Sequence, residues 1–227
     1  MSCGGTSKAT TELSILAYEN ARATAYPIPL ELERHVGHAD EWGASVFDLQ
    51  QQQVERDGPA IVEALTRIYQ LSWPERPYPT HVVAYANWQG AFSFTGRLMV
   101  LSSNNNSFND RWYPLESVFH EAMHQWDDRV SQALQAQATR QGVTVAQDMS
   151  HALVFFTVGY VVQRLHPDHE PFIDAANLWR GTLSGARVPV GRLRPAIQAT
   201  WKAYIDGRGT RDEAFAAMVA AAAAPSP

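Results

Sequence analysis

The chain has 227 residues, of which 45% are hydrophobic, so it is long enough to bury a proper core. Its formal net charge is −5, and its 18 Lys and Arg residues are scattered. The basic patch that nucleic acids require is therefore absent from the sequence. The most apolar stretch, 152–162, is about half of the roughly 20 residues needed to cross a bilayer. We expect neither nucleic-acid binding nor a transmembrane segment.

The single cysteine, Cys3, excludes an internal disulfide framework. It precedes a Gly/Ser-rich stretch, as the lipid-modified cysteine of a mature bacterial lipoprotein does, although no apolar leader precedes it here. Two locations stay open on this basis. The chain is either exported or lipid-anchored through Cys3 in a bacterial cell envelope, or it is cytoplasmic. Residues 1–12 are predicted to be flexible.

The pattern over the N-terminal half predicts mixed secondary structure. A short strand is expected at 13–17, and the polar, Gln-rich stretch 31–57 is expected to be helical. The Gly-Pro pair at 58–59 is expected to end this helix, and Pro59 to begin the next one. Segments 80–86 and 92–103 are rich in β-branched and aromatic residues, which is typical of two or three short strands.

The most informative motif is His120-Glu121-Ala122-Met123-His124, an HExxH, in a segment that follows Pro114 and has apolar residues at a helical spacing. On a helix, residues four positions apart lie on the same face. Both imidazoles can therefore bind one divalent ion, with Glu121 beside them.

A catalytic zinc ion takes three protein ligands and one water, and two of these ligands can come from one helix. The ion lowers the pKa of its water, and a neighbouring carboxylate accepts the proton and later delivers it to the leaving amine. Glu121 is predicted to be this general base and not a ligand. Isolated HExxH strings also occur by chance, so the helical context carries much of the interpretation.

The strand-rich region followed by the HExxH helix resembles the zincin metallopeptidases over about residues 80–164. The resemblance implies a small sheet whose edge strand pairs with an extended peptide substrate, and a third metal ligand on a later helix. In the metzincin branch the motif continues HExxHxxGxxH, but this chain has Asp127 and Val130 at the last two of those positions. That branch is therefore excluded. The gluzincin branch places a Glu on the later helix, and the apolar helix predicted at 148–165 contains none.

The third ligand consequently departs from the gluzincin pattern. We expect His151, at the start of the 148–165 helix, to be the third zinc ligand, because it is the best-placed imidazole after the motif. Glu170, Asp148 and Asp127 remain alternatives. A buried, hydrogen-bonded structural histidine would be the ordinary interpretation of His151 if no metal were involved.

Two further roles are predicted near the site. Tyr160 is a candidate to donate a hydrogen bond to the oxyanion of the reaction. Nine positions from His151 is about half a turn of helical phase, so this role requires a bend at Gly159. Asp127 and Asp128 are candidates to orient a histidine ring, or are part of a solvated helix face.

The remaining histidines carry no metal prediction. His35 and His38 lie in a polar stretch, and His166 and His169 lie in a Pro-containing turn where exposed polar residues are expected. The C-terminal third is expected to be helical over three segments: 172–179, 193–205 and 212–223.

The predicted fold is α+β and mainly helical, with a small sheet packed on the HExxH helix and a helical C-terminal lobe. Residues 13–224 are predicted to form a single catalytic domain, with lobes at 13–113 and 114–224. The predicted function is zinc-dependent hydrolysis of peptide bonds in a peptide or protein substrate. The alternative is an inactive zincin-like scaffold that binds peptides or a partner protein. A binding module has no need of Glu121, which therefore favours catalysis.

Overall fold

The computed structural model describes residues 30–34, 41–73, 78–83, 91–94, 98–102, 111–146, 148–181 and 190–223. The predictions for the first 29 residues, including the strand at 13–17 and the role of Cys3, lie outside this range, as do His35 and His38. The chain divides into two compact units. The first comprises residues 1–62 and 73–109, and the second comprises 63–72 and 110–227.

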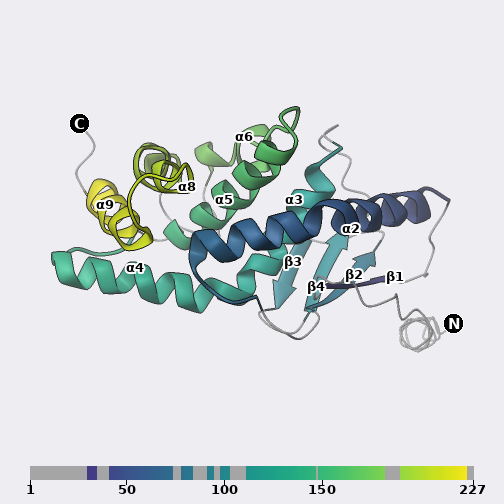
Figure 1. Ribbon diagram of the computed structural model, residues 1–227, viewed down its shortest axis with the longest axis horizontal. Coiled ribbons are helices and arrows are strands. Elements are labelled where there is room, and N and C mark those ends of the chain that lie inside the picture. Colours follow the sequence, from purple (N-terminus) through teal and green to yellow (C-terminus); the bar gives the residue numbers. More distant parts are fainter. Residues whose placement is uncertain are drawn as a thin grey trace, which may run out of the picture. The chain divides into compact units, whose positions relative to one another are not determined.

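The first unit contains a four-stranded sheet with the strand order β1-β2-β4-β3 (Figure 1). β1 pairs with β2 and β2 with β4 in parallel, whereas β3 and β4 form an antiparallel pair. Strands predicted within 80–86 and 92–103 are thereby confirmed. The strand bounds are β1 Leu30–Arg34, β2 Tyr78–Val83, β3 Ala91–Phe94 and β4 Leu98–Ser102.

The helix predicted over 31–57 was wrong at its start, because residues 31–34 belong to strand β1. The sequence there, Leu-Glu-Leu-Glu-Arg, alternates apolar and polar residues, which is the period of a strand. The helix itself, α2 (Glu41–Tyr69), begins ten positions later than predicted and is 29 residues long.

The predicted helix boundary at Pro59 was also wrong, because α2 continues through this residue without a break. A proline inside a helix removes one backbone hydrogen bond and costs about 3 kcal/mol. A row of buried aliphatic side chains on the same helix offsets this cost, since each contributes about 1.5–3 kcal/mol when fully buried. These are Val54, Ile61, Leu65 and Ile68.

The HExxH segment is helical, as predicted. α3 (Tyr113–Met123) has Pro114 in its first turn, where the missing N–H is not needed. A 3₁₀ turn, η1 (His124–Trp126), joins it to α4 (Asp127–Gln141). Gly142 ends α4 with φ of 66°, a left-handed conformation that glycine adopts at low cost.

The second predicted site helix is also present. α5 (Met149–Leu165) passes through Gly159 as one helix, and it packs against α3 and α4. The C-terminal predictions are confirmed in outline, in shorter pieces than expected. These are α6 (Phe172–Ala175), η2 (Leu178–Arg180), η3 (Val190–Leu193), α7 (Arg194–Ala196), the π-helical turn η4 (Ile197–Trp201), α8 (Lys202–Ile205) and α9 (Arg211–Ala223).

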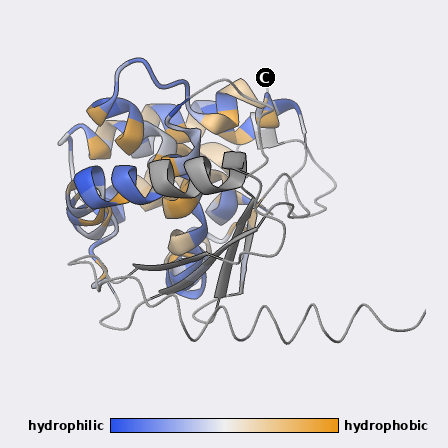
Figure 2. Cartoon of the chain, turned by 90° about the vertical axis from the view of Figure 1, so that its right-hand side faces the viewer, coloured by the Kyte–Doolittle hydropathy of each residue, from blue (hydrophilic) through white to orange (hydrophobic). Residues whose placement is uncertain are grey.

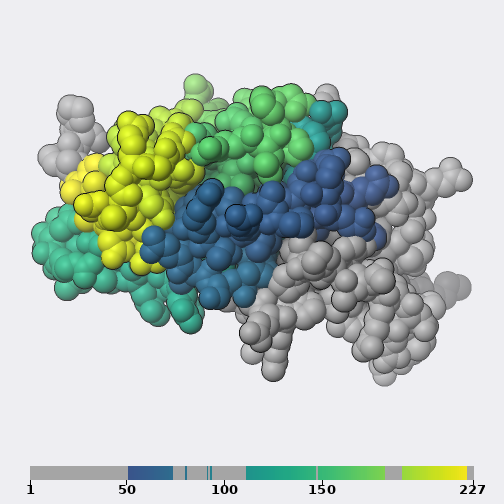
Figure 3. All heavy atoms as spheres, in the orientation of Figure 1, coloured from purple at the N-terminus to yellow at the C-terminus, as the bar shows by residue number. Residues whose placement is uncertain are grey.

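The second unit has an apolar core that encloses a group of buried polar side chains around Thr157. Hydrophobic and hydrophilic residues alternate along several of its helices (Figure 2). Helix α9 lies beside α4 (Figure 3). In this group, the Tyr69 hydroxyl and the Trp201 indole N–H each donate to the Thr157 hydroxyl oxygen over 2.9 Å. Thr157 in turn donates to the Leu153 carbonyl, so these buried groups satisfy one another.

The described part of the chain is therefore mainly helical, with one small sheet. None of its helices combines the length and the apolar character needed to span a bilayer. The predicted packing of the sheet on the HExxH helix and the single catalytic domain stay predictions.

Candidate metal site

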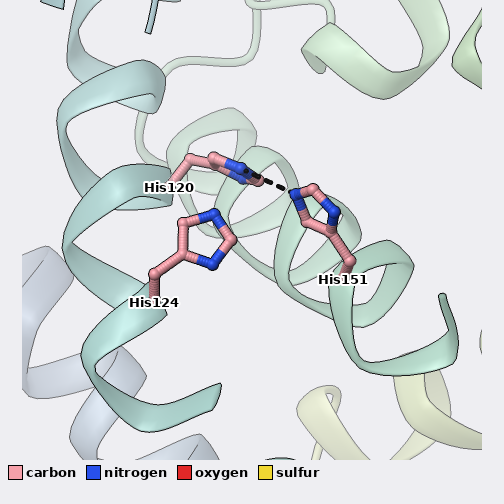
Figure 4. A group of neighbouring side chains, drawn as sticks. All are labelled: His120, His124 and His151. Atoms are coloured by element: carbon pink, nitrogen blue, oxygen red, sulfur yellow. Dashed lines mark hydrogen bonds between the residues drawn. The ribbon is translucent and has the colours of Figure 1, made fainter. Parts of the chain in front are cut away.

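Three histidines from two helices of the second unit come together: His120 at the last turn of α3, His124 at the junction with η1, and His151 in the first turn of α5 (Figure 4). The centres of the three rings are 5.0–5.3 Å apart. One nitrogen of each ring lies within 4.8 Å of the others, an arrangement that could hold a metal ion. We call these three residues the histidine group.

The spacing inside the histidine group fits a tetrahedral ion. The Nε2 atoms of His120 and His151 are 3.3 Å apart. In a tetrahedral site with Zn–N bonds of about 2.0–2.1 Å, two ligand nitrogens are separated by roughly 3.3 Å. One pair already has this separation, and the His124 nitrogen lies within 4.8 Å of both. Binding an ion would draw the rings slightly closer together.

Asp127 determines which nitrogen of His124 faces the group. The Nδ1–H of His124 donates to the Asp127 carboxylate over 2.8 Å, which leaves the Nε2 lone pair for a metal. A carboxylate on the outer nitrogen of a metal-binding histidine fixes its tautomer and orientation. Of the two roles that the sequence left open for Asp127, the structure shows the contact that ring orientation requires. Asp128, the next residue, is exposed.

Glu121 lies close to the histidine group and is almost fully buried, with 5% of its surface exposed. Its Oε2 atom is 4.0 Å from Nε2 of His124. The carboxylate is thus beside the nitrogen that faces the group, which is where a general base for a metal-bound water is needed.

Burial and mutual repulsion keep two of the three histidines neutral. Burial, and then the neighbouring His124 and His151, lower the pKa of His120 well below its usual range. Burial and His124 lower the pKa of His151 to about 4. Burial also opposes protonation of His124, but the Asp127 hydrogen bond and the charges of Asp127 and Glu121 outweigh it and raise its pKa. At neutral pH, His120 and His151 are therefore neutral, which is the protonation state that a metal-binding histidine requires.

Phe155 is a part of the site that the sequence prediction missed. Its ring stacks on His120 with 3.8 Å between ring centres and on His151 with 4.9 Å. Phe155 lies four positions after His151 on the same helix, and this spacing was the available signal.

A buried carboxylate–histidine pair lies one turn before His120 and was also missed. The His169 Nε2–H donates to Glu116 Oε2 over 2.6 Å, and the backbone N–H of Phe172 donates to the same oxygen over 2.9 Å. Both side chains of the pair are buried, whereas His169 was expected to be exposed. The 53 positions between them leave no signal in the sequence.

The other candidate residues lie elsewhere. Within the described residues, neither Asp148 nor Glu170 belongs to the histidine group, and Asp127 contacts it only from the outer nitrogen of His124. The Tyr160 hydroxyl donates to Asp206 over 2.7 Å, and α5 shows no break at Gly159. An oxyanion role for Tyr160 stays a prediction.

Comparison with protein-family models, with curated proteins and with solved structures found no match to this chain. A proposal for the function therefore rests on the geometry of the histidine group.

Proposed function

We propose that the chain is a zinc-dependent hydrolase that cleaves peptide bonds, with His120, His124 and His151 as the metal ligands and Glu121 as the general base. The observation that carries this proposal is the 3.3 Å separation of the facing Nε2 atoms of His120 and His151, with His124 as the third donor. Catalytic zinc sites have three protein ligands and leave a fourth position open to water.

Each group in the site has a distinct role in the proposed reaction. A bound zinc ion would lower the pKa of a coordinated water and polarise the substrate carbonyl. Glu121 accepts the proton of the attacking water and then delivers it to the leaving amine. Asp127 keeps the Nδ1 proton on His124, so that its Nε2 points to the ion.

The choice of a peptide substrate rests on the resemblance to zincins, in which the edge strand of a small sheet pairs with an extended peptide. In this chain, β1 and β3 are the edge strands of the sheet. The buried Glu121 beside the histidine group favours a hydrolase over a peptide-binding scaffold, because binding alone does not require a base.

The test compares zinc-loaded wild type with Glu121→Gln on a broad peptide library. The variant is expected to keep its zinc and to lose hydrolysis by about 10²- to 10⁴-fold, the usual contribution of a general base. Glu170→Gln is the matched control, because Glu170 is exposed and outside the histidine group; it is expected to cleave like wild type. If wild type binds zinc but cleaves nothing in the library, the hydrolase proposal is wrong and the alternative, a peptide-binding scaffold, takes its place.

A further inference from the structure

The ring of Phe155 stacks on the rings of two proposed metal ligands, His120 and His151. Its ring plane is inclined by 29° to that of His120 and by 25° to that of His151. The planes of the two histidines differ from each other by 33°. The phenyl ring therefore lies nearly parallel to both imidazoles whose Nε2 atoms face each other.

His120 lacks the usual means of orienting a ligand ring. Metal-binding histidines nearly always donate their outer N–H to a carboxylate, a carbonyl or a water. His124 does so through Asp127. The Nδ1 atom of His120 is buried, and in the part of the chain that the structure describes it has no hydrogen-bond partner. Packing against Phe155 is therefore a means of orienting this ring.

The Phe155 ring is itself held in place. Its centre is 6.0 Å from that of Phe172, a buried residue whose backbone N–H donates to Glu116. Glu116 lies on α3, one turn before His120. The contact with Phe172 thus connects Phe155 to a buried hydrogen bond between α6 and α3, the helix that carries His120.

The contact also favours the metal-bound state. An imidazole that coordinates a cation loses electron density to it, and the face of a phenyl ring attracts positive charge. The stack is therefore stronger with an ion bound than without one. On this basis, which rests on the metal site proposed above, we infer that Phe155 is a positioning residue: it holds His120 and His151 in the orientation that binds the metal.

The test measures zinc affinity by competition with a chelating dye, and unfolding by urea in the presence of a chelator. Phe155→Leu keeps an apolar side chain and removes the ring, and it is expected to weaken zinc binding about tenfold. Phe155→Tyr keeps the ring and is expected to bind zinc like wild type. Phe156→Leu is the matched control, because Phe156 is buried and stacks on Tyr160; it is expected to lower stability without changing zinc affinity.

Each outcome decides the inference. If Phe155→Leu binds zinc as tightly as wild type, or if Phe155→Tyr is weakened as much as Phe155→Leu, the ring does not position the ligands and the inference is wrong, while the metal site remains. A Phe155→Leu chain that does not fold assigns Phe155 to the core and also overturns it. If wild type binds no zinc, the inference falls together with the proposed function.

Discussion

The Nε2 atoms of His120 and His151 face each other at 3.3 Å, although 31 positions separate the two residues in the sequence. They come from α3 and α5, which pack directly against each other. His124 and Asp127 complete the arrangement, and both follow His120 within seven positions of the sequence. The predictions below follow from this geometry.

Asp127→Asn is expected to weaken zinc binding by roughly 10- to 100-fold, the usual effect of losing an outer carboxylate partner. The amide carries no charge, so it holds the His124 tautomer less firmly, and the pKa of His124 is expected to fall because Asp127 raises it. Zinc competition and an NMR titration of the His124 ring measure the two effects. Asp128→Asn, at the exposed neighbouring position, is the control and should leave both unchanged.

The stability of the metal-free protein is expected to fall in mild acid. Burial lowers the pKa of His120 and His151 in the folded chain, that of His151 to about 4. Below the unfolded pKa of about 6.5, the unfolded chain binds protons that the folded chain does not. The free energy of unfolding should therefore decrease from pH 6.5 towards pH 4, by up to about 1.4 kcal/mol per pH unit for each of the two histidines.

His124 contributes with the opposite sign. Its pKa is raised in the folded chain, so its contribution to stability is present below pH 6.5 and is lost as the pH rises through the folded pKa. Urea unfolding in chelator between pH 7 and pH 5 measures the sum. His151→Gln should flatten the acid side of this profile, because it removes a histidine whose pKa is lowered in the folded chain. Parallel profiles for wild type and His151→Gln would contradict the assigned protonation states.

Gly159→Ala is expected to destabilise the protein by about 1–3 kcal/mol, the cost of overpacking a core. A Cβ at this position would lie 2.7 Å from Pro171 Cβ and 2.9 Å from Glu116 Oε1. Helix propensity alone predicts a gain of about 1 kcal/mol for the same change. Urea unfolding distinguishes the two signs. Gly181→Ala, whose Cβ meets only an ordinary contact at 3.6 Å, is the control and should be nearly neutral.

Much of the fold could be predicted from local patterns. α3 and α5 carry apolar residues at the helical period over more than ten positions, which is the strongest signal a sequence offers. Strand β1 was missed because four of its five alternating residues were included in a longer polar stretch. The prediction at Pro59 was wrong because its local preference is outweighed by the burial of Val54, Ile61, Leu65 and Ile68 on the same helix.

The candidate site was predictable only where its parts are close in sequence. The pair His120 and His124 follows from one helical turn, and Asp127 is three positions from the ring it binds. His151 was chosen because zinc needs a third donor, and the packing of α5 on α3 brings it to the others. The partnership of Glu116 with His169 depends on tertiary contacts alone, so no local pattern could indicate it.

The most direct test of the central claim is a zinc titration of the purified wild-type chain and of His151→Ala, with metal content measured after dialysis. The account predicts about one zinc ion per wild-type chain. For His151→Ala it predicts a loss of affinity larger than the roughly 10- to 100-fold expected for an outer-shell partner. A wild type that retains no zinc, or a variant that retains it as tightly, would contradict a metal site built from His120, His124 and His151.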